Sequence, residues 1–172
     1  MTAYKCLRTG AVAPFTEIVW PQPTGPEPGR WVDAGAVDPC RRGVHACSAD
    51  DLPYWLQDEL WEIELDGDVQ RIGHKLAARR GRLVHRVSAW HTDAARAFAL
   101  LCAGRTAALA TGAPEVSGHA DDAARIAATG NAAVTGFIAA RAAELTGGVD
   151  AYDAERALQV EWLVEHLSLD AV

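Results

Sequence analysis

The sequence changes character near Trp90, and this change constrains the fold more than any other feature. Residues 91–172 contain 24 alanines, and alanine has the highest intrinsic helix propensity. Residues 1–90 contain short apolar runs separated by proline and glycine, most clearly at 21–29, where four prolines and two glycines exclude helix and strand alike. We predict an α+β protein in which a mixed α/β domain, residues 1–90, carries the functional site and a helical extension, residues 91–172, packs on it.

The N-terminal half is predicted to be mostly antiparallel β structure with one short helix. Runs of strand length occupy residues 3–8, 15–20, 30–35 and 82–90. Between residues 61 and 66, apolar and acidic side chains alternate as in a half-buried strand, and the following Asp66-Gly67 predicts a turn or hairpin. The short helix is predicted to begin between Ser48 and Asp51, which have capping-box spacing, and to end near Leu60.

The C-terminal half is predicted to contain at least three helices and no strand within residues 93–168. Thr92 or Asp93 can cap the first helix. The following helical runs occupy 119–130, 131–147 and 152–169, and the first two of these end in glycine, as helices often do.

The charge distribution limits the classes of partner. The net charge is −7, which makes the chain a poor candidate for bulk nucleic-acid binding. Residues 71–86 nevertheless hold six bases and no acid: Arg71, Lys75, Arg79, Arg80, Arg82 and Arg86. This strip can hold a phosphate or an acidic partner, or it can be a solvated surface that balances the acidic helical half. No apolar segment approaches the roughly 18 residues that span a bilayer, so we expect a cytoplasmic protein without a membrane partner, with reduced cysteines.

The stretch "PCRRGVHACSADDLPYWL", residues 39–56, holds the candidate site, and three interpretations of it remain open. Thiolate and imidazole are zinc ligands, so Cys6, Cys40, His45 and Cys47 can together form a four-ligand site. Alternatively, Cys40 and Cys47 are small buried side chains and His45 is a core histidine whose ring bonds to a backbone carbonyl. Thirdly, His45 and Cys47, two apart on a strand, would project to the same side and form a catalytic or binding pair.

The order of motifs in residues 4–90 resembles an uncharacterised family of small bacterial and phage proteins that has a Cys-x(2-3)-Gly-[Phe/Val]-His-Ala-Cys signature. The matching segments are "YKCL" at 4–7, "CRRGVHAC" at 40–47 and "LWEIELDGDV" at 60–69. This resemblance implies no activity. The helical tail is similar to that of actinobacterial members.

The same region is similar in pattern to ADP-ribosyltransferase cores, in which a Gly-[Leu/Ile/Val]-Tyr-Phe-[Ala/Ser/Thr] strand precedes a short helix. The matching positions are 43–47, Tyr54 and 62–65. The resemblance implies a nucleotide-handling fold with NAD chemistry. His45 stands where those enzymes have an aromatic residue, and no residue matches their catalytic glutamate.

Two functional hypotheses follow. The first is a small-molecule or nucleotide-handling protein with a pocket near residues 43–47. An ADP-ribosyltransferase-like enzyme is one form of this hypothesis. Its candidate catalytic residues are His45, Cys47 and Glu64, and its candidate ligand-binding residues are Tyr4, Lys5, Tyr54, Arg79 and Arg80. The second is a non-catalytic binding or regulatory module with a structural Cys/His zinc site.

For the first hypothesis we expect His45 to be partly buried, to face a pocket and to lie within reach of Tyr4 or Lys5. A histidine sealed in an apolar core would lose roughly 1–3 kcal/mol for each unpaired ring nitrogen. The start of the following helix would place Ser48 and free backbone N–H groups beside it, where an anion can bind.

Overall fold

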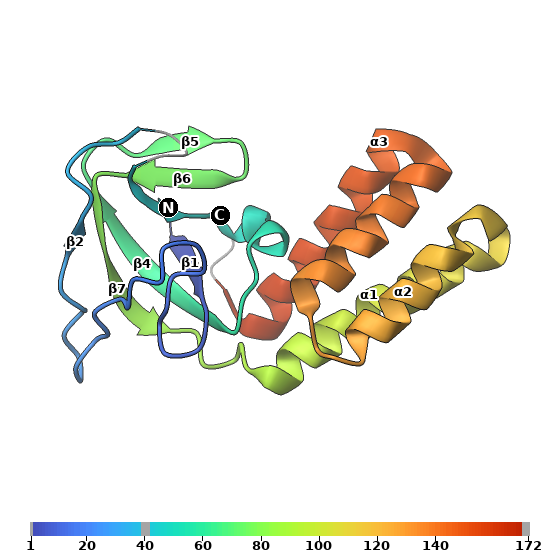
Figure 1. Ribbon diagram of the computed structural model, residues 1–172, viewed down its shortest axis with the longest axis horizontal. Coiled ribbons are helices and arrows are strands. Elements are labelled where there is room, and N and C mark those ends of the chain that lie inside the picture. The colour runs from blue at the N-terminus through green and yellow to red at the C-terminus, as the bar shows by residue number, and fades with distance from the viewer. Residues whose placement is uncertain (1, 39–41, 170–172) are drawn as a thin grey trace. The chain divides into compact units, whose positions relative to one another are not determined.

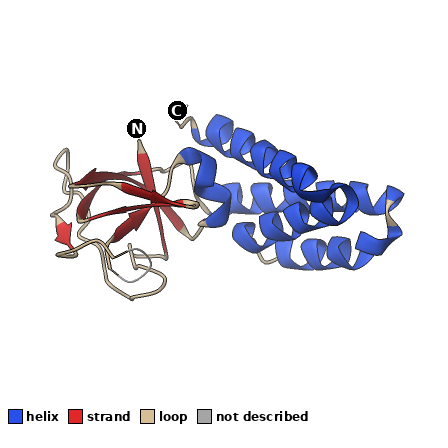
Figure 2. Cartoon of the chain, turned by 90° about the horizontal axis from the view of Figure 1, so that it is seen from above, coloured by secondary structure: helices blue, strands red, loops and turns tan. Residues whose placement is uncertain are grey.

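The computed structural model describes residues 2–38 and 42–169, which divide into two compact units, 2–88 and 89–169. All the described strands belong to the first unit and the three α-helices to the second (Figures 1 and 2). The predicted α+β class is therefore confirmed. Within the described ranges, no helix combines the length and the apolar character needed to cross a membrane.

The N-terminal unit contains two antiparallel sheets. The first has the strand order β1 (Ala3–Leu7), β4 (Glu59–Asp66), β7 (Arg80–Arg86) and β2 (Val32–Asp33). The second has the order β3 (Val44–Ala46), β6 (Lys75–Ala78) and β5 (Gln70–Ile72). An isolated antiparallel bridge joins Tyr4 of β1 to Cys47, just after β3, through two backbone hydrogen bonds of 2.8 Å.

The two sheets share one apolar core. The alternation predicted for β4 is present, because Trp61 and Ile63 are buried while Glu64 is exposed. Leu83 of β7 and Val44 of β3 belong to the same buried cluster. Burial of one such aliphatic side chain stabilises the fold by about 1.5–3 kcal/mol, so this core holds the two sheets together.

Residues 15–20 are irregular, where the sequence predicted a strand. Val19 makes only an isolated bridge with Val12. Pro14 and Pro21 flank the segment, and a proline has no N–H with which to continue a ladder. The segment is therefore a loop.

The turn predicted at Asp66-Gly67 is present, and Gly67 has a φ of 94° that favours glycine. It leads from β4 into β5, which belongs to the other sheet, so it does not form a hairpin. The predicted short helix is η1 (Ala49–Tyr54), a 3₁₀ helix that contains Pro53 and ends earlier than expected. A 3₁₀ geometry suits so short a segment because each bond spans only three residues.

The helical unit consists of α1 (Thr92–Gly112), the 3₁₀ turn η2 (Pro114–Val116), α2 (Ser117–Ala127) and α3 (Ala132–Leu167). The prediction of at least three helices and no strand in residues 93–168 is confirmed. The last two predicted helices form α3 together, with a break at Gly148, whose φ is 75°. The cap of α1 is His91, whose ring accepts a hydrogen bond from the Asp93 backbone N–H, rather than Thr92 or Asp93.

Candidate functional site

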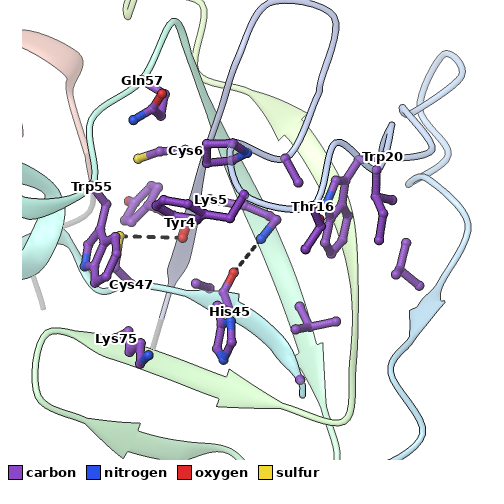
Figure 3. A pocket seen from close by; sticks show the side chains of 18 of the residues that line it. Tyr4, Lys5, Cys6, Thr16, Trp20, His45, Cys47, Trp55, Gln57 and Lys75 are labelled. Carbon is purple, nitrogen blue, oxygen red and sulfur yellow. Dashed lines mark hydrogen bonds between the residues drawn. The ribbon is translucent and has the colours of Figure 1, made fainter. Parts of the chain in front are cut away.

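A cavity of about 530 Å³ lies in the N-terminal unit. Its lining comes from β1, the loop at 13–20, β2, residues 43–47, the end of η1 and Lys75 at the start of β6. Figure 3 shows Lys5 and Trp20 on one side of it and the segment that carries His45 below them. The volume lies within the range of about 300–1,000 Å³ that is typical of small-molecule sites.

The Gly-Val-His-Ala-Cys stretch forms one wall of the cavity in an extended conformation. Gly43 has a φ of 136°, which a residue with a side chain rarely adopts, so glycine is needed where the chain enters β3. Val44 and Ala46 are buried in the core between the sheets. All five residues of the stretch nevertheless line the cavity, His45 and Cys47 among them, as does Tyr4 opposite Cys47.

Lys5 provides an amine at the wall of this cavity. Its Nζ donates a hydrogen bond of 2.6 Å to the His45 backbone carbonyl and lies 4.5 Å from the centre of the Trp20 ring. Burial lowers the pKa of Lys5 to about 8, although the neighbouring Cys6 and Cys47 thiols act in the opposite direction. The expected proximity of His45 and Lys5 is thus present, but the contact is made by the histidine backbone.

The His45 ring is partly buried, as expected, and one of its nitrogens lacks a partner. Nε2 is buried and makes no hydrogen bond within the described part of the chain. Burial, together with the charges of Lys75 and Lys5, lowers the pKa of His45. The imidazole is therefore favoured in its neutral form, with a nitrogen that can bond to a ligand.

Cys47 has the environment of an unreactive thiol. A hydrogen bond with the Cys6 thiol, burial and the Cys6 charge raise the pKa of Cys47 well above its usual value. The Cys47 Sγ lies 3.6 Å from the Tyr4 carbonyl oxygen. Because the thiolate is the nucleophilic form, this environment opposes a catalytic role for Cys47.

The remaining candidate residues are divided between the cavity and the surface. Tyr54 lines the cavity, whereas Glu64, Arg79 and Arg80 are not among its lining residues. Glu64 forms an ion pair of 2.7 Å with Arg82. Arg79 and Arg80 form ion pairs with acids of the first sheet.

The basic strip at 71–86 is a paired surface for the most part. Five of its six bases form ion pairs with acids from other segments: Arg71 with Asp51, Arg79 with Asp33, Arg80 with Asp66, Arg82 with Glu64 and Arg86 with Glu59. The sixth, Lys75, lines the cavity. The strip is therefore mostly an ion-paired surface, but these five acids belong to the N-terminal unit and not to the acidic helical half that was expected to balance it.

The helix start beside the motif is occupied by the chain's own carboxylate. Ser48 Oγ donates a hydrogen bond of 2.7 Å to Asp51, which also accepts from Arg71 at 2.9 Å and contacts His74 Nδ1 at 3.0 Å. The Ser48 side chain at the N-cap makes no capping hydrogen bond to η1. An anion would have to compete with the buried Asp51 carboxylate there.

The zinc hypothesis finds no cluster to support it in residues 2–38 and 42–169. No group of three or more His, Cys, Asp or Glu side chains in these ranges is placed to hold a metal ion. Cys6, His45 and Cys47 all line the cavity. Cys40, the fourth predicted ligand, lies outside the described residues.

The candidate ligand-binding residues did not include several lining residues, among them Trp20, Trp55, Gln57 and Lys75, although Lys75 was named as part of the basic strip. A signal for Lys75 was present in the composition, because the chain has only two lysines and both line the cavity.

No protein-family model, curated protein or solved structure matches the chain.

Proposed function

We propose that the N-terminal unit binds a small anionic molecule with an apolar or aromatic body. The observation that carries this proposal is the cavity itself, which combines apolar and aromatic walls with the Lys5 amine beside Trp20. Ligand sites commonly have this composition, in which apolar walls supply most of the affinity and a few polar groups orient the ligand.

The charges at the cavity favour an anion. Lys5 and Lys75 line it. Among the described lining residues the one acid is Asp33, which accepts a hydrogen bond of 2.7 Å from the Gly35 backbone N–H and contacts Arg79 at 3.5 Å. Asp33 is thus engaged by groups of the protein, and the positive charges of the two lysines attract an anionic ligand.

Nucleotides belong to this ligand class. The aromatic side chain of Trp55, which is partly exposed, gives a flat apolar surface on which a base can stack. The similarity of residues 43–47 to ADP-ribosyltransferase cores also makes a nucleotide a candidate. Binding is nevertheless better supported than transfer, because Glu64 is paired with Arg82 and the Cys47 environment favours its thiol form.

A binding panel tests the proposal. Isothermal titration calorimetry of the whole chain with AMP, NAD⁺ and 4-hydroxymethylbenzoate covers nucleotides and a simple aromatic carboxylate. We expect at least one of them to bind, and to bind more weakly to Lys5→Met, with unchanged affinity for the surface control Arg82→Gln. Binding that is equal in all three proteins, or absent in all of them, would contradict the proposal.

A further inference from the structure

The distribution of the basic residues points to a chemical role for an amine. The chain contains fourteen arginines and two lysines, yet among the residues that the structure describes, the 21 that line the cavity include both lysines and no arginine. Either residue would supply positive charge. Lysine differs because it can lose its proton and present a nucleophilic lone pair, which arginine does not do in proteins.

Lys5 has the surroundings that such chemistry requires. Its hydrogen bond to the His45 carbonyl uses one N–H, so the neutral amine keeps its lone pair for a second partner. The lowering of the pKa from 10.5 to about 8 raises the neutral fraction near pH 7 roughly 300-fold. Desolvation of a lysine in an apolar pocket is an established means of activating it as a nucleophile.

The orphan nitrogen of His45 provides the second component. A buried nitrogen without a hydrogen bond destabilises the protein, and a bound ligand that bonds to it recovers this free energy. A neutral imidazole at the cavity wall can also accept and return a proton. Lys75 lies close enough to His45 to lower the pKa of its ring, and its ammonium can attract an anionic group on the same ligand.

We propose that Lys5 forms an imine with an aldehyde or ketone that also carries a carboxylate or phosphate. This inference depends on the proposed binding function and specifies its ligand class. The neutral amine attacks the carbonyl carbon, and a proton passes from nitrogen to oxygen to give a carbinolamine. Loss of the hydroxyl group as water, with a proton delivered through His45, gives the protonated imine. Hydrolysis reverses the reaction, and no oxidant or reductant is consumed.

Borohydride trapping tests the imine. The whole chain is incubated at pH 7 with 4-carboxybenzaldehyde and sodium cyanoborohydride, and tandem mass spectrometry locates the secondary amine. We expect Lys5 to be labelled about tenfold or more faster than Lys75. We expect this preference to disappear in urea, where both side chains are solvated. In Lys5→Arg we expect no adduct at position 5.

Two further measurements separate the roles of the neighbours. Lys75→Met should raise the half-labelling concentration of 4-carboxybenzaldehyde about fivefold, but not that of uncharged benzaldehyde. His45→Phe should slow labelling at saturating aldehyde. Thermal unfolding of each variant shows that it is folded.

The outcomes distinguish the imine from simple binding. If 4-hydroxymethylbenzoate, which cannot form an imine, binds while Lys5 is labelled no faster than in urea, the binding function stands and the imine is overturned. If neither compound binds and Lys5 is not labelled preferentially, both proposals fail. Preferential labelling of Lys75 would also overturn the role assigned to Lys5.

Discussion

Glu59 is expected to control the stability of the cavity wall. It begins β4 with only 5% of its surface exposed, and its carboxylate accepts hydrogen bonds from the backbone N–H groups of Gly10 (3.0 Å) and Ala11 (3.1 Å) and from Trp61 Nε1 (3.0 Å). These bonds attach the segment that leads into the loop at 13–20. One side chain therefore links the first sheet to a wall of the cavity.

Replacing this carboxylate by an amide, Glu59→Gln, should lower the free energy of unfolding of the N-terminal unit by about 2–4 kcal/mol. The amide keeps one oxygen acceptor and turns an NH₂ donor toward a group that also donates. At least one of the three N–H groups then loses its partner, and the remaining bonds lose their charge assistance. The matched control Glu64→Gln removes an exposed partner of Arg82 and should cost less than about 1 kcal/mol.

Urea unfolding followed by near-ultraviolet circular dichroism measures the global effect, and hydrogen exchange of the peptide covering residues 8–20 measures the local one. Glu59→Gln should speed amide exchange in this peptide more than in α1. Equal stability of Glu59→Gln and Glu64→Gln would refute the reasoning, because the buried bonds would then contribute no more than an exposed ion pair.

The pH dependence has a defined sign. Burial opposes ionisation of Glu59, but the bonds from Trp61, Gly10 and Ala11 and the charge of Arg86 outweigh it, so the pKa of Glu59 lies below its usual value of 4.5. Stability from this group is fully present above the unfolded-state pKa and is lost as the pH falls through the folded-state pKa. The difference in free energy of unfolding between the wild type and Glu59→Gln should thus decrease below about pH 4.5. An advantage that is the same at pH 7 and pH 3 would contradict this assignment.

Three further predictions follow from single contacts. Gly81→Ala should destabilise the N-terminal unit by about 1–3 kcal/mol, because the added Cβ would lie 2.9 Å from Val44 Cγ1; unchanged urea unfolding would show that β7 can shift freely. Iodoacetamide at pH 8 should modify Cys6 faster than Cys47, whose pKa is raised by a hydrogen bond with Cys6 and by burial; mass spectrometry would contradict this if Cys47 reacted first. Gln159→Leu should destabilise the helical unit by about 1–3 kcal/mol, since the buried amide bonds to three groups of α3; helix circular dichroism during heating measures the loss, and no loss would mean that these bonds are replaced by packing.

Part of the candidate site could be predicted because its pattern is local. The alternation in β4 and the extended Gly-Val-His-Ala-Cys segment both depend on residues that are near one another in sequence. His45 is partly buried and lines the cavity, as expected, but the cost of an unpaired imidazole nitrogen does not account for this position, because Nε2 is buried without a hydrogen-bond partner in the described part of the chain.

The misplaced expectations depended on contacts between distant segments. Glu64 and Arg80 were candidate site residues, but the register of β4 and β7 sets Glu64 opposite Arg82 and Asp66 opposite Arg80, so each finds a cross-strand partner. Neither the pairing of these strands nor its register can be obtained from the spacing within either strand. The same limit applied at Asp66-Gly67. The turn could be predicted from these two residues, but the sheet that β5 joins is set by contacts with distant segments.

By itself the sequence determined the α+β class, the change of structure near residue 90 and the chemistry available at residues 43–47. These properties arise from propensity and periodicity, which act over a few residues. Only the tertiary structure decided that the loop at 13–20 would complete a cavity and that Lys5 and Lys75, seventy positions apart, would both line it. The physical reason is that a cavity is the space left between packed segments, and the lowered pKa of Lys5 arises from burial that no local pattern encodes.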